Sequence, residues 1–337
     1  MTYLVEMSKK ELNAITLADD LVELLREHPS QTALVHSVYP HAVNLLIRED
    51  ELITLTSQDD IPPMGLMVNC STSFTEFLSA GDKVILETDQ LTAVNGSFTV
   101  DFRDAKVWKA RSLLNLDRFS TEDVTQNRHN LIRWLAQQPA EGLLPLLPRL
   151  THLSMSSKPV VDNIYSRYIA DDLDAFTTAI NTSAWEQASV LADRLIGFGM
   201  GSTPSCDDFL AAYMIVLAIA DASYPGQHPW VRQFNQTIAS KAKSRTTLIS
   251  ANMLRLAADG KTSRSHQQLI QTCLFKNSGQ LEYSASQVMR HGATSGGDFL
   301  LGLICAFEWV QNTMTDISKE GERAWVENNQ PQPVPGI

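Results

Sequence analysis

The sequence predicts an α+β protein in which a β-rich barrel or sandwich domain precedes a mainly α-helical domain. Between residues 31 and 110, short apolar runs alternate with polar residues at the period of strands. From residue 122 onward, apolar residues recur at the period of helices. The 337 residues, of which 44% are hydrophobic, are enough to build two cores. We expect an N-terminal domain at residues 1–115, a helical domain at 116–327 and a disordered tail at 328–337.

The first element is expected to be an amphipathic helix from Ser8 to Glu27. Apolar residues occur there at helical spacing, and His28-Pro29-Ser30 ends the pattern. Packing against its own domain is the commoner use of such a face. A docking or dimer element is the alternative.

Seven strands are expected in the N-terminal domain, because turn residues separate seven short alternating runs. Asn95-Gly96 is a strong hairpin signal, since this dipeptide favours a tight turn between strands. The strands are expected at residues 33–38, 42–47, 52–56, 65–69, 83–87, 91–94 and 97–102, with a helical turn at 73–79. No catalytic constellation lies in this region, so ligand specificity or subunit contact is its expected role.

The second domain should consist of helices. They are expected at residues 124–137, 143–150, 164–169, 172–181, 184–196, 211–220, 231–256, 265–275 and 301–310. The runs 211–220 and 301–310 are apolar on nearly every face, which is typical of buried helices.

Composition excludes several classes of function. The net charge is −11 and no lysine- or arginine-rich run occurs, which disfavours nucleic acid and anionic membranes as partners. Four widely spaced cysteines form no C-x-x-C pair and no zinc-ligand spacing with histidines. The N-terminus has no signal-peptide pattern, and no stretch is long and apolar enough to span a bilayer. We therefore expect a soluble, cytoplasmic protein with reduced cysteines and assign no residues to a metal.

A glycine-rich loop starts at Gly197 and leads into the apolar run at residues 211–220. Alternating glycines let backbone N–H groups approach a ligand closely, because no Cβ stands in the way. Pro204 and the residues after it indicate a helix start, where a phosphate or carboxylate is favoured. The candidate anion-binding residues of this loop are Gly199, Gly201, Thr203, Ser205 and Asp207.

A second loop, from His291 to Leu300, repeats the first. The alignment pairs Ser205 with Ser295 and Asp208 with Asp298, and both loops enter an apolar helix. This duplication predicts two helix N-termini converging on one ligand, to which Thr294 and Ser295 would contribute. The alternative is that both loops are ordinary turns whose serines and aspartates cap helices.

A third polar segment, from Lys241 to Ser250, completes the candidate binding residues. Arg245 carries a planar fork suited to phosphate or carboxylate, and Thr246, Thr247 and Ser250 supply hydroxyls. Thr246 and Ser250 are four residues apart and would share a helical face. A solvated helix face is the alternative.

The candidate catalytic residues are His291, Asp208 and Asp298. His291 is a candidate general base because the ordinary pKa of histidine is near neutrality. Together with Asp207, the two aspartates could hold Mg²⁺ beside a phosphate, and they could equally be caps. No cofactor other than Mg²⁺ is suggested.

Several familiar sites are excluded by their missing residues. The first loop lacks the lysine that ends a P-loop, which disfavours a free-standing kinase or ATPase. It reads G-x-G-x-G and follows a helix, unlike the dinucleotide-binding motif, which follows a strand. Neither a G-x-S-x-G nor an H-E-x-x-H motif occurs.

The combined motifs resemble the AllH family of bacterial oxamate carbamoyltransferase subunits. They are the loop from Gly197 to Leu210, the Thr246-Thr-Leu-Ile-Ser250 segment followed by Leu254, Ala257 and Gly260, and the loop from His291 to Leu300. The strand-rich half, with Pro62-Pro63 and Gly81-Asp82, fits the same family. Ser202, Cys206 and Gly292-Ala293 depart from the family pattern.

The resemblance implies a subunit of a multi-protein enzyme of anaerobic allantoin catabolism. The implied partners are an acyl-CoA-synthetase-like subunit and a second large subunit. The implied reaction converts oxalurate and phosphate into oxamate and carbamoyl phosphate. A non-catalytic metabolite-binding scaffold or regulatory subunit, and a paralogue acting on another ureido acid, are the alternatives.

Overall fold

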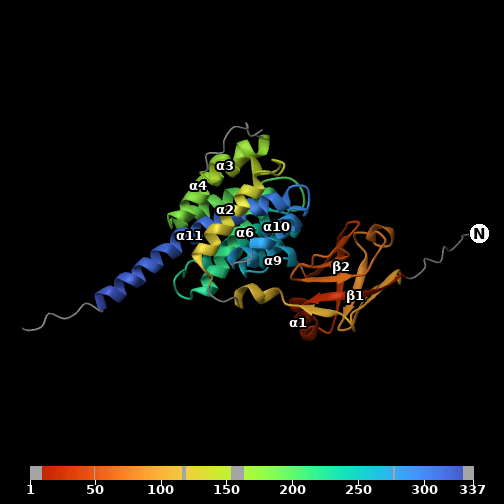
Figure 1. The fold of residues 1–337 in the computed structure, drawn as a ribbon. Coiled ribbons are helices and arrows are strands. Elements are labelled where there is room, and N and C mark those ends of the chain that lie inside the picture. The colour runs from red at the N-terminus through yellow and green to blue at the C-terminus, as the bar shows by residue number, and fades with distance from the viewer. Residues whose placement is uncertain (1–9, 49, 116–118, 153–162, 276–277, 329–337) are drawn as a thin grey trace, which may run out of the picture.

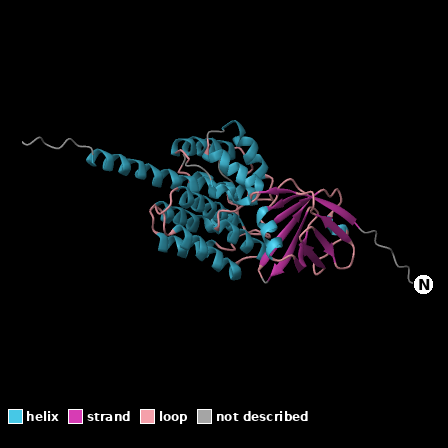
Figure 2. Cartoon of the chain, turned by 90° about the horizontal axis from the view of Figure 1, so that it is seen from below, coloured by secondary structure: helices cyan, strands magenta, loops and turns pink. Residues whose placement is uncertain are grey.

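The computed structural model describes residues 10–48, 50–115, 119–152, 163–275 and 278–328 (Figure 1). The strands gather at one end of the molecule and most of the helices at the other (Figure 2). This arrangement confirms the predicted α+β class, with the β-rich part first. The tail expected to be disordered lies, apart from Asn328, outside the described residues.

The N-terminal part is a closed barrel built from a single sheet. Its strands are β1 (Lys10–Ala18), β2 (Ser30–Val38), β3 (Ala42–Arg48), β4 (Glu51–Thr56), β5 (Gly65–Val68), β6 (Lys83–Glu87), β7 (Gln90–Ala93), β8 (Phe98–Asp101) and β9 (Lys106–Trp108). They are ordered β5-β4-β3-β2-β6-β7-β8-β1-β9, and antiparallel pairing of β1 with β5 closes the sheet. Along one edge of β1, β8 pairs with its first half and β9 with its end. Closure leaves few unpaired strand edges.

The prediction of one helix from Ser8 to Glu27 is wrong for its first half. Residues from Lys10 onward form β1, and helix α1 begins only at Asp19 (Asp19–Glu27). Leu12, Ala14 and Thr16 point inward, whereas Ile15 is exposed, which is the alternation of a strand. Helical spacing and strand alternation overlap in so short a segment. Pairing with β5 on one side and β8 and β9 on the other decides between them.

All seven predicted strands are confirmed, and β1 and β9 are additional. The Asn95-Gly96 turn joins β7 to β8, with Gly96 at a φ of 74° and its N–H bonded to the Ala93 carbonyl. The expected helical turn is a short 3₁₀ helix, η1 (Phe74–Glu76), capped by Ser73. The barrel core is lined by inward-facing aliphatic residues of every strand from β1 to β8.

The C-terminal part is a bundle of helices. They are α2 (Thr121–Leu135), α3 (Leu147–Leu150), α4 (Ile164–Asn181), α5 (Trp185–Leu195), α6 (Ser205–Ser223), α7 (Val231–Arg245), α8 (Leu248–Ala258), α9 (Arg264–Leu274), α10 (Leu281–Met289) and α11 (Ser295–Asn328). Short 3₁₀ helices η2 (Ala110–Asn115), η3 (Leu144–Leu146) and η4 (Ser278–Gln280) lie between them. None of the helices in the described part combines the length and hydropathy that a bilayer span requires.

The expected helix at residues 231–256 is wrong as a single element. The chain is extended at Thr246, with φ −134° and ψ −175°, so α7 ends there and α8 starts anew. The Thr247 hydroxyl caps α8 by accepting a hydrogen bond from the Ser250 N–H. Conversely, the two helices expected at 164–169 and 172–181 form one helix, α4, and α10 was not predicted. The break after α7 turns out to shape the site described below.

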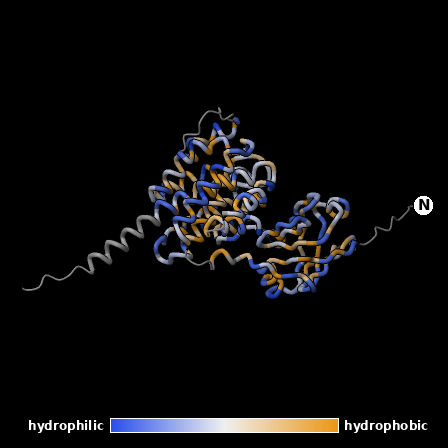
Figure 3. Tube along the Cα trace, in the orientation of Figure 1, coloured by the Kyte–Doolittle hydropathy of each residue, from blue (hydrophilic) through white to orange (hydrophobic). Residues whose placement is uncertain are grey.

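Helices α6 and α11 form the centre of the bundle. Most of α6 is buried, and hydrophobic stretches, in orange, run through the interior of the helical part (Figure 3). The two helices approach so closely at Gly302 that a Cβ there would collide with the backbone carbonyl of Phe209. Arg128 of α2 also holds α11 in place, by donating a hydrogen bond to the Ile304 carbonyl and by an ion pair with Glu308.

The barrel and the bundle are joined by specific polar contacts. The Asn252 side chain accepts a hydrogen bond from the Leu52 N–H and donates one to the Asp50 carbonyl. Lys261 and Asp20 form a largely buried ion pair at 2.6 Å. Because each contact pairs a group of the barrel with a group of α8 or the segment after it, the two parts are held in a defined relation.

We expect the Gly302→Ala substitution to destabilise the protein, although alanine is normally the better helix former. The added methyl must push α6 and α11 apart, at a cost of about 1–3 kcal/mol. Urea unfolding would measure the loss. Gly279→Ala is the matched control, because a Cβ at Gly279 meets open space. Equal stability of the two variants would contradict close packing at Gly302.

Candidate functional site

The two glycine-rich loops meet at the adjoining N-termini of α6 and α11. Thr203 of the first loop and Ser295 of the second share a hydrogen bond between their hydroxyls, with 2.9 Å between the oxygens. The repeat visible in the sequence therefore corresponds to one place in space. Because α6 and α11 both pack in the hydrophobic core, the position of each loop is set by the packing of the helix that follows it.

Backbone conformation explains the glycines of the first loop. Gly197, Gly199 and Gly201 have φ values of 80°, 130° and 92°, which side-chain-bearing residues rarely adopt. At Gly199 a Cβ would also collide with the backbone nitrogen of Ser205, and at Gly197 with the carbonyl oxygen of Arg245. The glycines thus let the loop fold back on the start of α6.

Serine and aspartate side chains are exchanged between the two loops. The Ser295 and Thr203 hydroxyls lie near the Asp208 carboxyl, on α6, and oppose the rise in its pKa. The Ser205 and Thr294 hydroxyls do the same at the Asp298 carboxyl, on α11. In each case the serine of one repeat contacts the aspartate of the other.

Both aspartates lie in the interior. Asp298 is fully buried and Asp208 nearly so, and among the described residues neither Oδ2 atom has a hydrogen-bond partner. The Asp298 Oδ1 atom accepts a hydrogen bond from the Leu143 N–H at 2.6 Å. Burial raises the pKa of Asp298 to about 6. The pKa of Asp208 is raised well above its ordinary value, first by burial and further by the nearby Asp298 and Asp207 carboxylates.

Asp207 has a different role, because its carboxylate is saturated with donors. Oδ1 accepts from the Gly197 N–H at 2.8 Å, and Oδ2 accepts from Thr246 at 2.5 Å and Ser250 at 2.6 Å. Burial raises the pKa of Asp207, and these three hydrogen bonds oppose the rise. Asp207 therefore fastens the loop to the α7–α8 break.

The break between α7 and α8 makes this contact possible. Thr246 and Ser250 do not share a helical face, since Thr246 is extended, yet both reach Asp207. Thr247 adds a hydrogen bond from its hydroxyl to the Ser202 carbonyl. Three hydroxyl residues predicted to contact a ligand thus hold the loop itself.

Arg245 is turned away from the two aspartates. Its guanidinium pairs with Asp193 of α5 at 3.4 Å, and its side chain is 46% exposed. It lies at the end of α7, next to the residues that contact Asp207. Arg245 therefore lies at the border of the site, where the Asp193 carboxylate already neutralises its charge.

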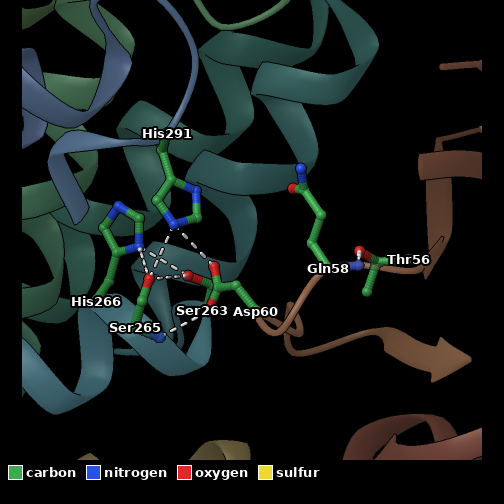
Figure 4. A network of polar contacts seen from close by, with 7 residues as sticks. All are labelled: Thr56, Gln58, Asp60, Ser263, Ser265, His266 and His291. Carbon is green, nitrogen blue, oxygen red and sulfur yellow. Dashed lines mark hydrogen bonds and ion pairs between the residues drawn. The ribbon is translucent and has the colours of Figure 1, made fainter. Parts of the chain in front are cut away.

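His291 belongs to a second polar cluster (Figure 4). Its Nε2 atom lies 3.2 Å from Asp60 Oδ2 and 3.1 Å from Ser265 Oγ. His266 contacts the same serine through Nδ1 at 3.2 Å and Ser263 at 2.7 Å. The pKa of His266 is lowered well below its ordinary value, by burial first and by His291 second. Sequence reasoning missed Asp60, Ser265 and His266.

No local signal could have revealed this second cluster. Asp60 lies in the barrel loop between β4 and β5, about 200 positions from its contacts, and its Oδ1 accepts a hydrogen bond from the Ser265 N–H at 2.7 Å. The barrel thus caps the N-terminus of α9. Asp60, His266 and His291 each offer one ligand atom within 4.8 Å of the others, which is a group able to hold a metal ion.

The surface above the buried aspartates is polar and accessible. Gly201, Ser202, Gly292 and Ala293 are exposed. The four hydroxyl residues that contact the aspartates, Thr203, Ser205, Thr294 and Ser295, are half-buried between the surface and the carboxyls. The arrangement combines hydroxyls and loop amides at the rim with two buried carboxyls of raised pKa underneath. Such a site can bind an anion and exchange a proton.

Comparison with known families identifies both halves of the chain. Residues 13–107 match a family model described as the AllH family N-terminal domain. Residues 195–307 match a model described as oxamate carbamoyltransferase subunit AllH, and this segment contains both glycine-rich loops. Together the two matches cover more than half of the chain. No solved structure matches it.

We expect Asp298→Asn to change how stability depends on pH. In the folded protein Asp298 keeps its proton up to about pH 6, whereas in the unfolded chain it loses the proton near pH 3.8. The free energy of unfolding should therefore fall as pH rises through this window, by roughly 3 kcal/mol for a shift of this size. Asparagine has no proton to lose and still accepts from Leu143, so its decline should be shallower.

Urea unfolding at several pH values within this window would measure the difference. Asp101→Asn is the control, since Arg103 lowers the pKa of half-buried Asp101 to about 2, so its contribution lies below the window. Parallel curves for Asp298→Asn and the parent protein would show that the carboxyl is ionised in the folded state throughout.

Proposed function

This chain belongs to the AllH family, as its motifs indicated, and from that membership we propose that it carries the carbamoyl-transfer site of an oxamate carbamoyltransferase. The proposed reaction converts oxalurate and phosphate into oxamate and carbamoyl phosphate. The bond between the carbamoyl carbon and the oxamate nitrogen breaks, and a bond from that carbon to a phosphate oxygen forms. The proton from the phosphate ends on the oxamate nitrogen.

The observation that supports this proposal is the exchange of serine–aspartate contacts between two helix N-termini. The leaving nitrogen needs a proton donor, because an amide anion is a poor leaving group. A carboxyl whose pKa is raised toward neutrality is suited to this task, and burial raises the pKa of both Asp208 and Asp298. We therefore assign proton transfer to this pair.

Phosphate would bind at the rim, to the amides of the glycine-rich loops and to the partly exposed hydroxyls. Two ionised carboxylates beneath it would repel it, and the raised pKa of each carboxyl favours the neutral form that relieves this repulsion. Backbone N–H groups at a helix N-terminus provide donors that need no rearrangement when negative charge develops. Gly199, Gly201, Thr203, Ser205, Thr294 and Ser295 are the residues we place in this role.

Asp207, Thr246, Thr247 and Ser250 would act by positioning. Their mutual hydrogen bonds hold the first loop against the α7–α8 break, so the amides of the loop keep one arrangement. Arg245, at the border of the site, would bind a ligand only if its ion pair with Asp193 broke.

We further propose that the chain works in a complex with an acyl-CoA-synthetase-like subunit and a second large subunit. The family description as a subunit supports an assembly. Co-purification with the products of neighbouring genes, followed by an assay for carbamoyl phosphate, would test it. Activity of the isolated chain would show that the partners are dispensable. If activity occurred only in the complex and persisted when both Asp208 and Asp298 were replaced, the result would favour the scaffold alternative.

In the assembled enzyme, Asp208→Asn and Asp298→Asn should each lower carbamoyl phosphate formation by about 10²–10⁴-fold, the usual contribution of a general acid. Asparagine keeps the shape and cannot give up a proton, so calorimetric phosphate binding should persist. Asp101→Asn, on the surface of the barrel, is the control. Full activity in both site variants would refute the assignment.

A further inference from the structure

We propose that Asp60, His266 and His291 form a binding site for a divalent first-row transition-metal ion such as Zn²⁺, located where the barrel meets the helical bundle. This site is separate from the carboxyl pair assigned to proton transfer. It does not depend on the proposed carbamoyl-transfer reaction.

The first argument is the convergence of ligand atoms. One ligand atom from each of the three residues lies within 4.8 Å of the other two, and His291 Nε2 and Asp60 Oδ2 are already 3.2 Å apart. Bonds of about 2.0–2.2 Å to a tetrahedral ion place neighbouring ligands roughly 3.3–3.5 Å apart. One pair therefore has the required spacing, and small side-chain rotations bring in the third.

The second argument is the orientation of the two imidazoles. His266 Nδ1 and His291 Nε2 both face the hydroxyl of Ser265, at 3.2 and 3.1 Å, and the rings are packed edge to face (Figure 4). The His266 ring also packs against Phe299 at 4.2 Å between centroids, which restrains its tilt. Ser263 Oγ also lies 2.7 Å from His266 Nδ1, so serine hydroxyls and both imidazole nitrogens point into one small space. A metal ion there would accept the lone pairs of both nitrogens, while Ser265 turns aside or becomes a further ligand.

The third argument is the neighbourhood of the carboxylate. Asp60 Oδ1 is held by the Ser265 N–H, which leaves Oδ2 directed at His291. A hydrogen bond to the second oxygen is the arrangement that orients carboxylate ligands in metal sites. The Asp60 side chain is 15% exposed and that of His291 32%, so an ion can reach the group from solvent.

The ligand set selects the class of ion. Two imidazole nitrogens and one carboxylate oxygen suit Zn²⁺, Co²⁺, Ni²⁺, Mn²⁺ or Fe²⁺, whereas Mg²⁺ and Ca²⁺ prefer oxygen ligands throughout. Three protein ligands leave at least one position for water or another oxygen donor. Because Asp60 comes from the barrel and both histidines from the bundle, a bound ion would also fasten the two parts together.

Metal binding by the full-length, chelator-treated protein tests the proposal. Titration with Co²⁺, followed by visible absorption, and calorimetry with Zn²⁺ should show stoichiometric binding that excess Mg²⁺ does not displace. Asp60→Asn and His291→Gln should each weaken binding by at least roughly tenfold, the lower end of the effect of losing even an outer-shell group. Zn²⁺ should raise the Tm of the parent protein by mass action and leave that of Asp60→Asn nearly unchanged.

His36→Gln is the matched control, because His36 is an exposed barrel histidine whose ring contacts Ser37. This variant should bind both ions as the parent does. Circular dichroism shows whether each variant is folded, and Asp60→Asn decides the outcome if His291→Gln is not. Absence of binding in the parent protein would overturn the proposal. So would equal affinity in the parent and in both site variants, which indicates adventitious binding elsewhere.

Discussion

The exchange of serine and aspartate side chains between the N-termini of α6 and α11 is the constraint around which the candidate site is built. Each buried aspartate lies against the serine of the opposite loop and a threonine of its own, so neither loop can move without disturbing the other. Close packing of the two helices at Gly302 brings these ends together. A site of this kind requires a rigid core behind it, because buried carboxyls tolerate little error in the position of their donors.

The three aspartates at the start of α6 and α11 lie in two kinds of surroundings. Asp207 is surrounded by donors that stabilise its carboxylate, whereas Asp208 and Asp298 each keep an oxygen without a partner among the described residues. Neighbouring aspartates thus differ in role because their surroundings differ. The first positions a loop, and burial raises the pKa of the other two.

The barrel contributes to the bundle through a few precise contacts. Asp60 reaches from the loop after β4 to the start of α9, and Asn252 reaches back to the backbone of β4 and the residue before it. Lys261 and Asp20 add a buried ion pair whose removal on one side would leave an uncompensated charge. The N-terminal domain therefore completes one end of α9, and with it the surroundings of His266 and His291.

Period and turn chemistry were sufficient for the fold class, for seven strands and for the two loops, because these depend on neighbouring residues. The same local information misassigned the segment before Asp19, where pairing across the barrel makes a strand. It also missed the break between α7 and α8 at Thr246. At this break Thr246 contacts Asp207 of α6, a residue far away in the sequence. Repetition of the Ser-x-x-Asp pattern indicated that two helix starts share a site. Only the tertiary structure decided that the aspartates lie buried beneath the hydroxyls, that Arg245 pairs with Asp193, and that His291 joins Asp60 and His266. Those contacts join residues far apart in the chain, and no local pattern encodes their distances.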